Sequence, residues 1–314
     1  MNPASTLFEQ VRLELDKAVV GKDDVKAVIF AAVLARGNVL LEGVPGIAKT
    51  LTARAMARVL GFSFSRVQFT PDLMPSDITG TSIYHQGKGV FEFVPGPIFS
   101  DFVLADEINR APAKTQAALL EAMEERQVTV DNRTFTLPPS FMVFATQNPL
   151  DFEGTYSLPE AQMDRFMVRI TVDYPTEDEE MSILSGIQTL PSGLLESLTP
   201  LQDCAQALDA AREFINSVVV DEKVMVYVRD LIRASRSLDE LLLGNSPRAG
   251  QMLIRIAKAY AAVTGSDFVT PDHVRELVPS VLPHRWVLRP EAEMRQDPIN
   301  SIVTSLFDCV KVPV

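Results

Sequence analysis

The feature that most constrains this chain is a short apolar run followed at once by a glycine-containing loop and a helical pattern. Residues 38–42 (Asn-Val-Leu-Leu-Glu) are nearly all apolar, as expected for a strand that is covered on both faces. Gly43 and Gly46 lie in the loop, which leads through Lys49 and Thr50 into a helix. This order of strand, loop and helix predicts a phosphate-binding loop in a parallel α/β domain.

The residues of this loop suit the binding of a phosphate chain. Gly43 and Gly46 let the backbone approach phosphate oxygens, where a Cβ atom would clash. Lys49 can reach the β- and γ-phosphates, and the Thr50 hydroxyl can bind Mg²⁺. Ala48 stands where the usual pattern has glycine. We expect Ala48 to adopt helical backbone angles and to leave the loop intact.

Polar residues end two further apolar runs. Asp106 and Glu107 follow the run 102–105, which predicts that they lie at the ligand-binding edge of the sheet. Asp106 would hold Mg²⁺ through water, and Glu107 would act as general base on the attacking water. Asn148 follows the strand predicted at 142–146 and could orient the water or the γ-phosphate. The alternatives are a solvated strand end with a helix cap, and a turn-forming asparagine.

Two arginines later in the chain could complete a site for phosphate hydrolysis. Arg165 lies just before the last predicted strand, and an arginine supplied across a subunit interface stabilises charge on a transferred phosphoryl group. Arg248 lies at a predicted helix start, with Ser246 as a possible cap and Pro247 in the first turn. Arg248 could reach a bound γ-phosphate. The simpler alternatives are an ion pair of Arg165 with Asp164 or a nearby carboxylate, and an ordinary surface position for Arg248.

The rest of the pattern predicts an α/β domain followed by a helical one. Further buried strands are predicted at 64–69, 102–106, 142–146 and 167–172, with a helix at 113–127. Residues 81–94 and 128–137 resemble hairpins inserted into this alternation. We place the domain boundary at Pro175, which gives an α/β core over residues 1–175 and an all-helical domain over 176–314. The stretch after Pro283 shows no clear pattern.

Composition narrows the possible partners and location. The chain has 314 residues, of which 46% are hydrophobic and 22% charged, as in ordinary globular proteins. Its net charge of −12 makes nucleic acid an unlikely partner, because phosphate neutralisation requires clustered lysine and arginine. The start of the chain lacks a signal-peptide pattern, and no apolar run reaches the roughly 18 residues of a membrane span. We therefore expect a cytoplasmic protein without a membrane span.

Taken together, these motifs resemble the MoxR family of AAA+ ATPases over nearly the whole chain. The segments between the phosphate loop and the last strand are more specific than the loop itself. The segments that carry the resemblance are Glu42–Thr50, Gln68–Gly80, Pro95–Pro97, Ala105–Pro112, Ala145–Pro149, Pro159–Phe166 and Ser246–Arg248. The resemblance implies an AAA+ αβα sandwich with a parallel sheet and a helical lid, with hairpins that correspond to the helix-2 insert and the pre-sensor-1 hairpin.

The resemblance also implies roles for individual residues. Gly43–Thr50 matches Walker A and Phe102–Glu107 matches Walker B, while Asn148 matches sensor 1, Arg165 the arginine finger and Arg248 sensor 2. The implied nucleotide contacts are Val20, Gly21, Gly43, Val44, Pro45, Gly46, Ile47, Ala48, Lys49, Thr50 and Leu51. Thr50 and Asp106 would hold Mg²⁺, and ATP would be the nucleotide. Whether Arg248 acts on its own subunit's nucleotide or on a neighbour's stays open.

The resemblance further implies partners. Members of this family form rings, often hexamers, and they remodel, mature or activate protein clients, commonly with a protein that carries a von Willebrand A domain. Two other motors share the same type of site: the motor subunit of a metal chelatase and a nucleic-acid-remodelling ATPase. A nucleotide-dependent switch with little turnover is a further alternative, which the presence of Glu107, Asn148 and Arg165 makes less favourable.

Overall fold

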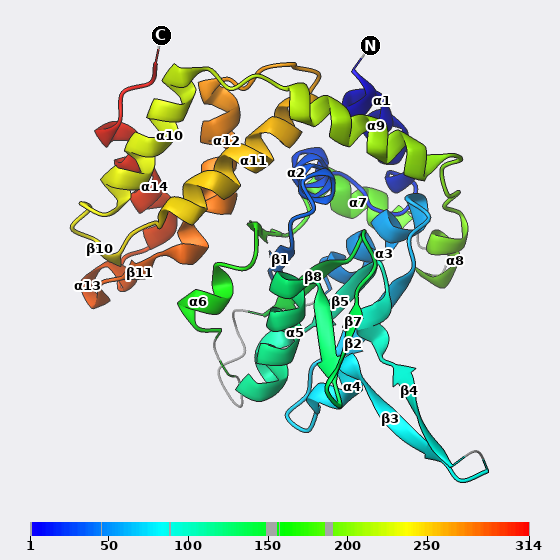
Figure 1. The fold of residues 1–314 in the computed structure, drawn as a ribbon. Helices are drawn as coiled ribbons and strands as arrows, with labels where there is room; N and C mark the ends of the chain where they lie inside the picture. The colour runs from blue at the N-terminus through cyan, green and yellow to red at the C-terminus, as the bar shows by residue number, and fades with distance from the viewer. Residues whose placement is uncertain are drawn as a thin grey trace.

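The centre of the molecule is a five-stranded parallel sheet with the strand order β2-β5-β8-β1-β9 (Figure 1). The computed structural model describes residues 2–44, 46–87, 89–148, 156, 158–185 and 191–313. The five strands are β1 (Val39–Glu42), β2 (Phe64–Gln68), β5 (Phe102–Asp106), β8 (Met142–Gln147) and β9 (Val168–Thr171). Every strand predicted for the sheet is therefore confirmed.

Helices cover both faces of the sheet, which explains why its strands are nearly continuous apolar runs. Successive residues of a strand point to opposite faces, and Val39 and Leu41 accordingly join one hydrophobic cluster while Leu40 joins a second. The first cluster includes residues of α1 (Pro3–Leu15), α2 (Asp23–Leu34) and α3 (Lys49–Val59); the second includes residues of α5 (Ala113–Glu125). The αβα sandwich is confirmed.

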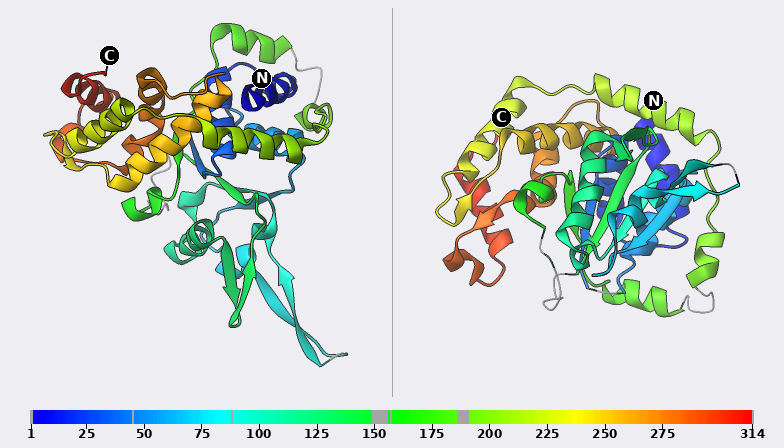
Figure 2. Two further views of the ribbon diagram at one scale, coloured as in Figure 1. Left: turned by 45° about the horizontal axis from the view of Figure 1, so that its top comes forward. Right: turned by 60° about the horizontal axis from the view of Figure 1, so that its bottom comes forward.

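Two antiparallel hairpins project from the sandwich, as predicted (Figure 2). The hairpin elements are β3 (Gly80–His85) with β4 (Val90–Pro95), and β6 (Gln127–Val130) with β7 (Arg133–Thr136). The Phe93 and Phe135 rings stack with centroids 4.1 Å apart and thereby join the two hairpins. The outer part of β3–β4 exposes Tyr84 and Phe91, whose rings lie against each other. Lys88 at its tip lies outside the described residues.

The second domain is mainly helical, and its longest helices curve around the N-terminal helices and one end of the sheet (Figure 1). Its helices are α7 (Glu177–Ser185), α8 (Pro191–Glu196), α9 (Cys204–Ser217), α10 (Glu222–Ser235), α11 (Pro247–Val263), α12 (Pro271–Val281), α13 (Pro290–Glu293) and α14 (Pro298–Cys309). The expectation of an all-helical domain needs one correction. The strands β10 (Leu241–Leu243) and β11 (Val287–Leu288) form an antiparallel pair that is too short to produce a readable alternation.

The N-terminal helices pack against the second domain as well as against the sheet. Helix α1 contacts α9, and α2 contacts α11, so that one hydrophobic cluster runs through both parts of the chain. The boundary at residue 175 therefore stays a prediction. The short elements also include α4 (Pro75–Thr79), α6 (Glu160–Met163) and the 3₁₀ turns at Pro97–Phe99, Ile108–Arg110 and Pro283–Arg285. Across the described residues, every helix is too short or too polar to pass through a bilayer.

The predicted functional residues lie at two opposite edges of the parallel sheet, one formed by the carboxyl ends of its strands and the other by their amino ends. The carboxyl ends of β1, β5 and β8 lie at one edge, where Gly43, Asp106 and Asn148 follow their strands. The amino ends of β1 and β9 pair at the other edge, next to Asn38 and Arg165. Since β1 has four residues, the two edges are separated by about 13 Å of strand.

Candidate active site

The loop between β1 and α3 has the backbone conformation of a tight anion cradle. Gly43 and Gly46 both have positive φ angles, of 149° and 87°. A Cβ atom on Gly43 would lie 2.4 Å from the carbonyl oxygen of Val172, which follows β9. Glycine is therefore required at position 43 by close backbone packing. Pro45, a predicted nucleotide contact, lies outside the described residues.

Ala48 adopts a conformation that its residue type does not favour. Its φ is +64° and its ψ is 16°, in the left-handed region, where it forms the N-cap of α3 without a side-chain cap. The expectation that Ala48 would take helical angles is therefore wrong. A Cβ in this region crowds the following carbonyl and costs roughly 1–2 kcal/mol. The loop keeps the shape that a glycine would give it, at the expense of local strain.

Lys49 folds back over the loop. Its ammonium group donates hydrogen bonds to the carbonyl oxygens of Gly43 and of Val44, the latter at 3.0 Å. Burial lowers the pKa of Lys49, and the carboxylates of Asp106 and Glu107 oppose that shift. These carbonyls hold the amine where a phosphate chain would pass.

One cavity brings together most of the predicted chemistry. Its volume is about 360 Å³, and its lining consists of Gly46, Ile47, Ala48, Lys49, Thr50, Leu51, Asp106, Glu107, Thr146, Gln147 and Asn148. The phosphate loop thus faces the polar ends of β5 and β8, and the predicted placement of Lys49, Thr50, Asp106, Glu107 and Asn148 agrees with this geometry.

Thr146 near the end of β8 connects the Asp106 carboxylate to the backbone of Glu107. Its hydroxyl donates to Asp106 Oδ1 at 2.5 Å and accepts from the backbone N–H of Glu107 at 2.9 Å. Glu107 itself has a left-handed φ of 57°. Such backbone strain is typical of functional positions, where the surrounding contacts maintain it. Thr146 was not among the predicted site residues, because an interior threonine in a strand is common.

Strand β2 supplies a second set of contacts that sequence reasoning also missed. Arg66 donates to Asp106 Oδ2 from Nε at 2.9 Å and from Nη2 at 2.6 Å. Gln68 donates to Glu107 Oε2 at 2.9 Å, and Arg110 lies 3.3 Å from the same oxygen. Positions 66 and 68 share one face of an edge strand, and this alternation of polar residues was the available signal.

The donor set at this cavity fits a magnesium nucleotide. The Thr50 hydroxyl and the Asp106 carboxylate offer hard oxygen ligands, of the kind that Mg²⁺ takes together with water and substrate phosphates. In the part of the chain that the structure describes, the buried Oε1 of Gln147 has no hydrogen-bond partner. A buried acceptor on the cavity wall is suited to bind an ordered water.

A second cavity, of about 450 Å³, lies on the other side of the same loop. Its wall combines the loop residue Ile47 and Val20, which precedes α2, with apolar side chains from α2, β1 and α3, including Ile29, Leu41 and Leu51. An apolar slot beside a phosphate loop suits a flat heterocyclic base. Val20 lines this cavity as the resemblance implied, whereas the neighbouring glycine at position 21 is not among its lining residues.

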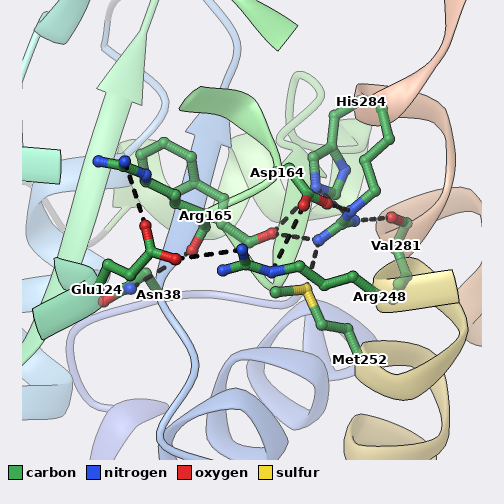
Figure 3. A network of polar contacts seen from close by, with 10 residues as sticks. Asn38, Glu124, Asp164, Arg165, Arg248, Met252, Val281 and His284 are labelled. Atoms are coloured by element: carbon green, nitrogen blue, oxygen red, sulfur yellow. Dashed lines mark hydrogen bonds and ion pairs between the residues drawn. The ribbon is translucent and has the colours of Figure 1, made fainter. Parts of the chain in front are cut away.

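The two arginines lie together, away from both cavities (Figure 3). Glu124 near the end of α5 bridges them: its carboxylate lies 3.1 Å from Arg165 Nη2 and 3.3 Å from Arg248 Nη1. Arg248 Nε also lies 3.5 Å from Asp164. Ser246 precedes α11 as predicted, but its side chain makes no capping hydrogen bond.

Comparison with known proteins agrees with this architecture. Residues 38–168 match the family model described as "ATPase family associated with various cellular activities (AAA)", and residues 233–305 match the model described as "AAA lid domain". The chain is 45% identical to an uncharacterised protein of Bacillus subtilis, YeaC, over 96% of this chain and 93% of that protein. It is 42% identical to the Mycobacterium tuberculosis protein named Chaperone MoxR1, over 98% and 82% of the two chains.

A solved structure resembles the whole molecule. The crystal structure of a candidate ATPase from Cytophaga hutchinsonii superposes with a TM-score of 0.89 and shares 38% sequence identity. The alignment covers 99% of this chain and 96% of that one. The likeness therefore extends over both the sandwich and the helical domain.

The left-handed conformation of Ala48 predicts that glycine is the better residue there. Ala48→Gly should raise the free energy of unfolding by about 1 kcal/mol, because it removes the Cβ contact at positive φ. Chemical denaturation, followed by the fluorescence of the single, buried Trp286, would measure this change. Ala55→Gly, at a buried position inside α3, is the matched control and should lower stability by a similar amount. Equal destabilisation by both substitutions would contradict the assigned backbone conformation.

Proposed function

Since the chain belongs to the MoxR family of AAA+ ATPases, we propose that it hydrolyses ATP at a site shared between neighbouring subunits of a ring, a hexamer in our proposal. The observation that carries this proposal is the separation of two groups of residues. Lys49, Asp106 and Glu107 border one cavity, while Arg165 and Arg248 meet at Glu124 outside it.

ATP binding rests on the phosphate loop and the start of α3. Backbone N–H groups at the helix N-terminus point toward the phosphate chain and favour negative charge. Lys49 exchanges its hydrogen bonds to the carbonyls of Gly43 and Val44 for contacts to the β- and γ-phosphates. Thr50 and Asp106 are the residues that would hold Mg²⁺, which when bound neutralises phosphate charge and orients the chain.

Hydrolysis requires an activated water, and we assign the acceptance of its proton to Glu107. Gln68 and Arg110 contact one oxygen of this carboxylate and set its orientation. Asn148, on the neighbouring strand end, borders the same cavity and can orient the water or the γ-phosphate. Glu107 thus has both the hydrogen-bonded support and the access to the cavity that a general base requires.

The two arginines act on the neighbouring subunit's nucleotide in this proposal. The backbone of Arg165 lies beside Asn38 at the amino end of β1, whereas the phosphate loop follows its carboxyl end. About 13 Å of strand separates these ends, and so the sheet itself supports action across a subunit interface. Because Arg248 shares Glu124 with Arg165, we assign both arginines to the neighbour's site.

The work that ATP hydrolysis drives is the remodelling, maturation or activation of protein complexes, with a von Willebrand A domain protein as the proposed partner. Two observations support a protein client: a relative of this chain is named a chaperone, and the projecting hairpin exposes apolar side chains. A nucleic-acid remodeller is the weaker candidate, because the chain carries a net charge of −12. A metal-chelatase motor would be recognised by co-purification with a large chelatase subunit.

The first prediction from the proposed function separates nucleotide binding from turnover. Lys49→Ala should raise the Kd for MgATP by about 10- to 100-fold, because a charged hydrogen-bond donor contributes roughly 1.5–3 kcal/mol. Glu107→Gln should keep the affinity and lower kcat by about 10²- to 10⁴-fold. Equilibrium binding and phosphate release would measure the two effects. Wild-type turnover by the Glu107→Gln variant would show that Glu107 is not the base.

The second prediction concerns the shared site. Arg165→Ala should retain MgATP affinity and lose hydrolysis, because the finger stabilises charge only during phosphoryl transfer. Mixing these subunits with Lys49→Ala subunits should restore part of the activity, since some interfaces then pair an intact loop with an intact arginine. Inactive mixed rings, with assembly verified by sedimentation, would place Arg165 in its own subunit's site.

The third prediction concerns the hairpin β3–β4. Replacing Tyr84–Val90 by a tight turn should leave ATP binding and basal hydrolysis unchanged, because the outer hairpin is remote from both cavities. Stimulation of ATPase activity by a client, and activation of that client, should be lost. Met294→Ser, which alters a highly exposed apolar residue of the second domain, should preserve both. Normal client activation by the shortened variant would exclude the hairpin as the contact.

A further inference from the structure

Arg285 is a buried arginine of the second domain to which no role is assigned. It lies in the 3₁₀ turn Pro283–Arg285, directly after α12, and its side chain is only 3% exposed. Its guanidinium donates to the Asp164 carboxylate (2.7 Å), the Phe166 carbonyl (2.6 Å), Met252 Sδ (2.7 Å) and the Val281 carbonyl, and its Nη1 lies 2.7 Å from His284 Nε2. A group that cannot lose its proton in proteins is here fully surrounded by acceptors.

Two of these contacts are to the residues before and after the arginine finger candidate in the chain. Asp164 precedes Arg165 and Phe166 follows it, so that one guanidinium binds the Asp164 side chain before residue 165 and the backbone carbonyl of Phe166 after it. From the core, Asn38 Nδ2 lies 3.5 Å from the carbonyl oxygen of Arg165 itself. The connection between α6 and β9 is thus held by Arg285 of the second domain and by Asn38, the residue before β1.

The chemistry of this contact requires arginine. The planar guanidinium presents five donors in a rigid fork, and so it can bind a carboxylate and a carbonyl at the same time. His284 adds no charge beside Arg285, because burial, together with Arg285 and Arg169 nearby, holds the pKa of His284 well below its ordinary value. A lysine could pair with Asp164, but as a compact point charge it could not hold both sides of residue 165.

Asp164 also links this contact to the second arginine. Its Oδ1 accepts from Arg285 at 2.7 Å, and its Oδ2 lies 3.5 Å from Arg248 Nε. Arg248 begins α11, and Met252 of the same helix contacts Arg285. Two segments of the helical domain that are far apart in sequence therefore converge on the residue before Arg165.

We propose that Arg285 is a positioning residue for ATP hydrolysis, which holds the Asp164 side chain and the Phe166 backbone on either side of Arg165 so that the finger meets the neighbouring subunit's nucleotide. This inference rests on the proposed role of Arg165. It also gives the helical domain a direct mechanical connection to the finger, since a displacement of the turn Pro283–Arg285 displaces Asp164 and Phe166 with it.

The test compares Arg285→Ala and Arg285→Lys with a variant that only weakens the same region. Arg285→Ala should lower kcat about 10²-fold, the effect expected of a small misplacement of a catalytic group, and leave the Kd for MgATP unchanged. Arg285→Lys, which keeps the charge beside Asp164, should fold and show a smaller loss of kcat. Trp286→Phe removes the bond from Trp286 Nε1 to Asn245 (2.6 Å) and should lower stability while kcat stays at the wild-type value.

Mixed rings give the readout that a merely structural role would not change. Arg285→Ala subunits should regain activity when mixed with Lys49→Ala subunits, which contribute an intact finger. They should gain nothing from Arg165→Ala subunits, because both variants are defective on the same side of the interface. The double variant Arg165→Ala/Arg285→Ala should be no less active than Arg165→Ala alone, as expected for residues that act as one unit.

The outcomes separate this inference from the proposed function. If Arg165→Ala hydrolyses ATP at the wild-type rate, the finger assignment fails, and the role proposed for Arg285 fails with it. If Arg165→Ala is inactive while folded Arg285→Ala and Arg285→Lys keep wild-type kcat, only the positioning role is overturned. The positioning role is likewise overturned if Lys49→Ala subunits do not rescue Arg285→Ala, or if Trp286→Phe loses as much activity as Arg285→Ala.

Discussion

The site depends on one buried carboxylate at the end of an apolar strand. Asp106 is 8% exposed, and an unpaired charge in such a position would cost several kcal/mol. Side chains from the strands on either side bind its two oxygens and offset this cost: Arg66 of β2 pairs with one oxygen, and Thr146 of β8 donates a hydrogen bond to the other. Thr146 also accepts a hydrogen bond from the backbone N–H of Glu107. The side chain that supports the proposed metal ligand, Asp106, therefore also holds the proposed base, Glu107, in its strained conformation.

The parallel sheet then determines which residues can work together in one protomer. Every loop that follows a strand contributes to one edge, and so the phosphate loop, Asp106 and Asn148 gather there. Arg165 precedes its strand and lies at the opposite edge, where Glu124 pairs with it and with Arg248, and where Asp164 pairs with Arg248. The need for a neighbouring subunit follows from strand direction, and the helical domain, through Arg285, controls the arginine side of that interface in our account.

Sequence reasoning succeeded where local pattern and burial agree. Apolar runs revealed the strands because both faces of the sheet are covered, and the turn at Asp131-Asn132 marked a hairpin because both residues adopt positive φ. It failed where the determinant is a backbone angle or a distant contact. Nothing local indicates that Ala48 is left-handed, that Arg66 meets Asp106 forty residues later, or that Arg285 binds the backbone beside Arg165.

The central claim is that the ATPase site exists only between subunits, and the most direct measurement is specific activity as a function of protein concentration. MgATP affinity and turnover should be measured on the same samples, with the assembly state determined by sedimentation. Our account predicts that turnover per subunit rises in parallel with ring formation, while the affinity of the loop for MgATP changes little. Full turnover by a dilute, strictly monomeric protein would contradict it.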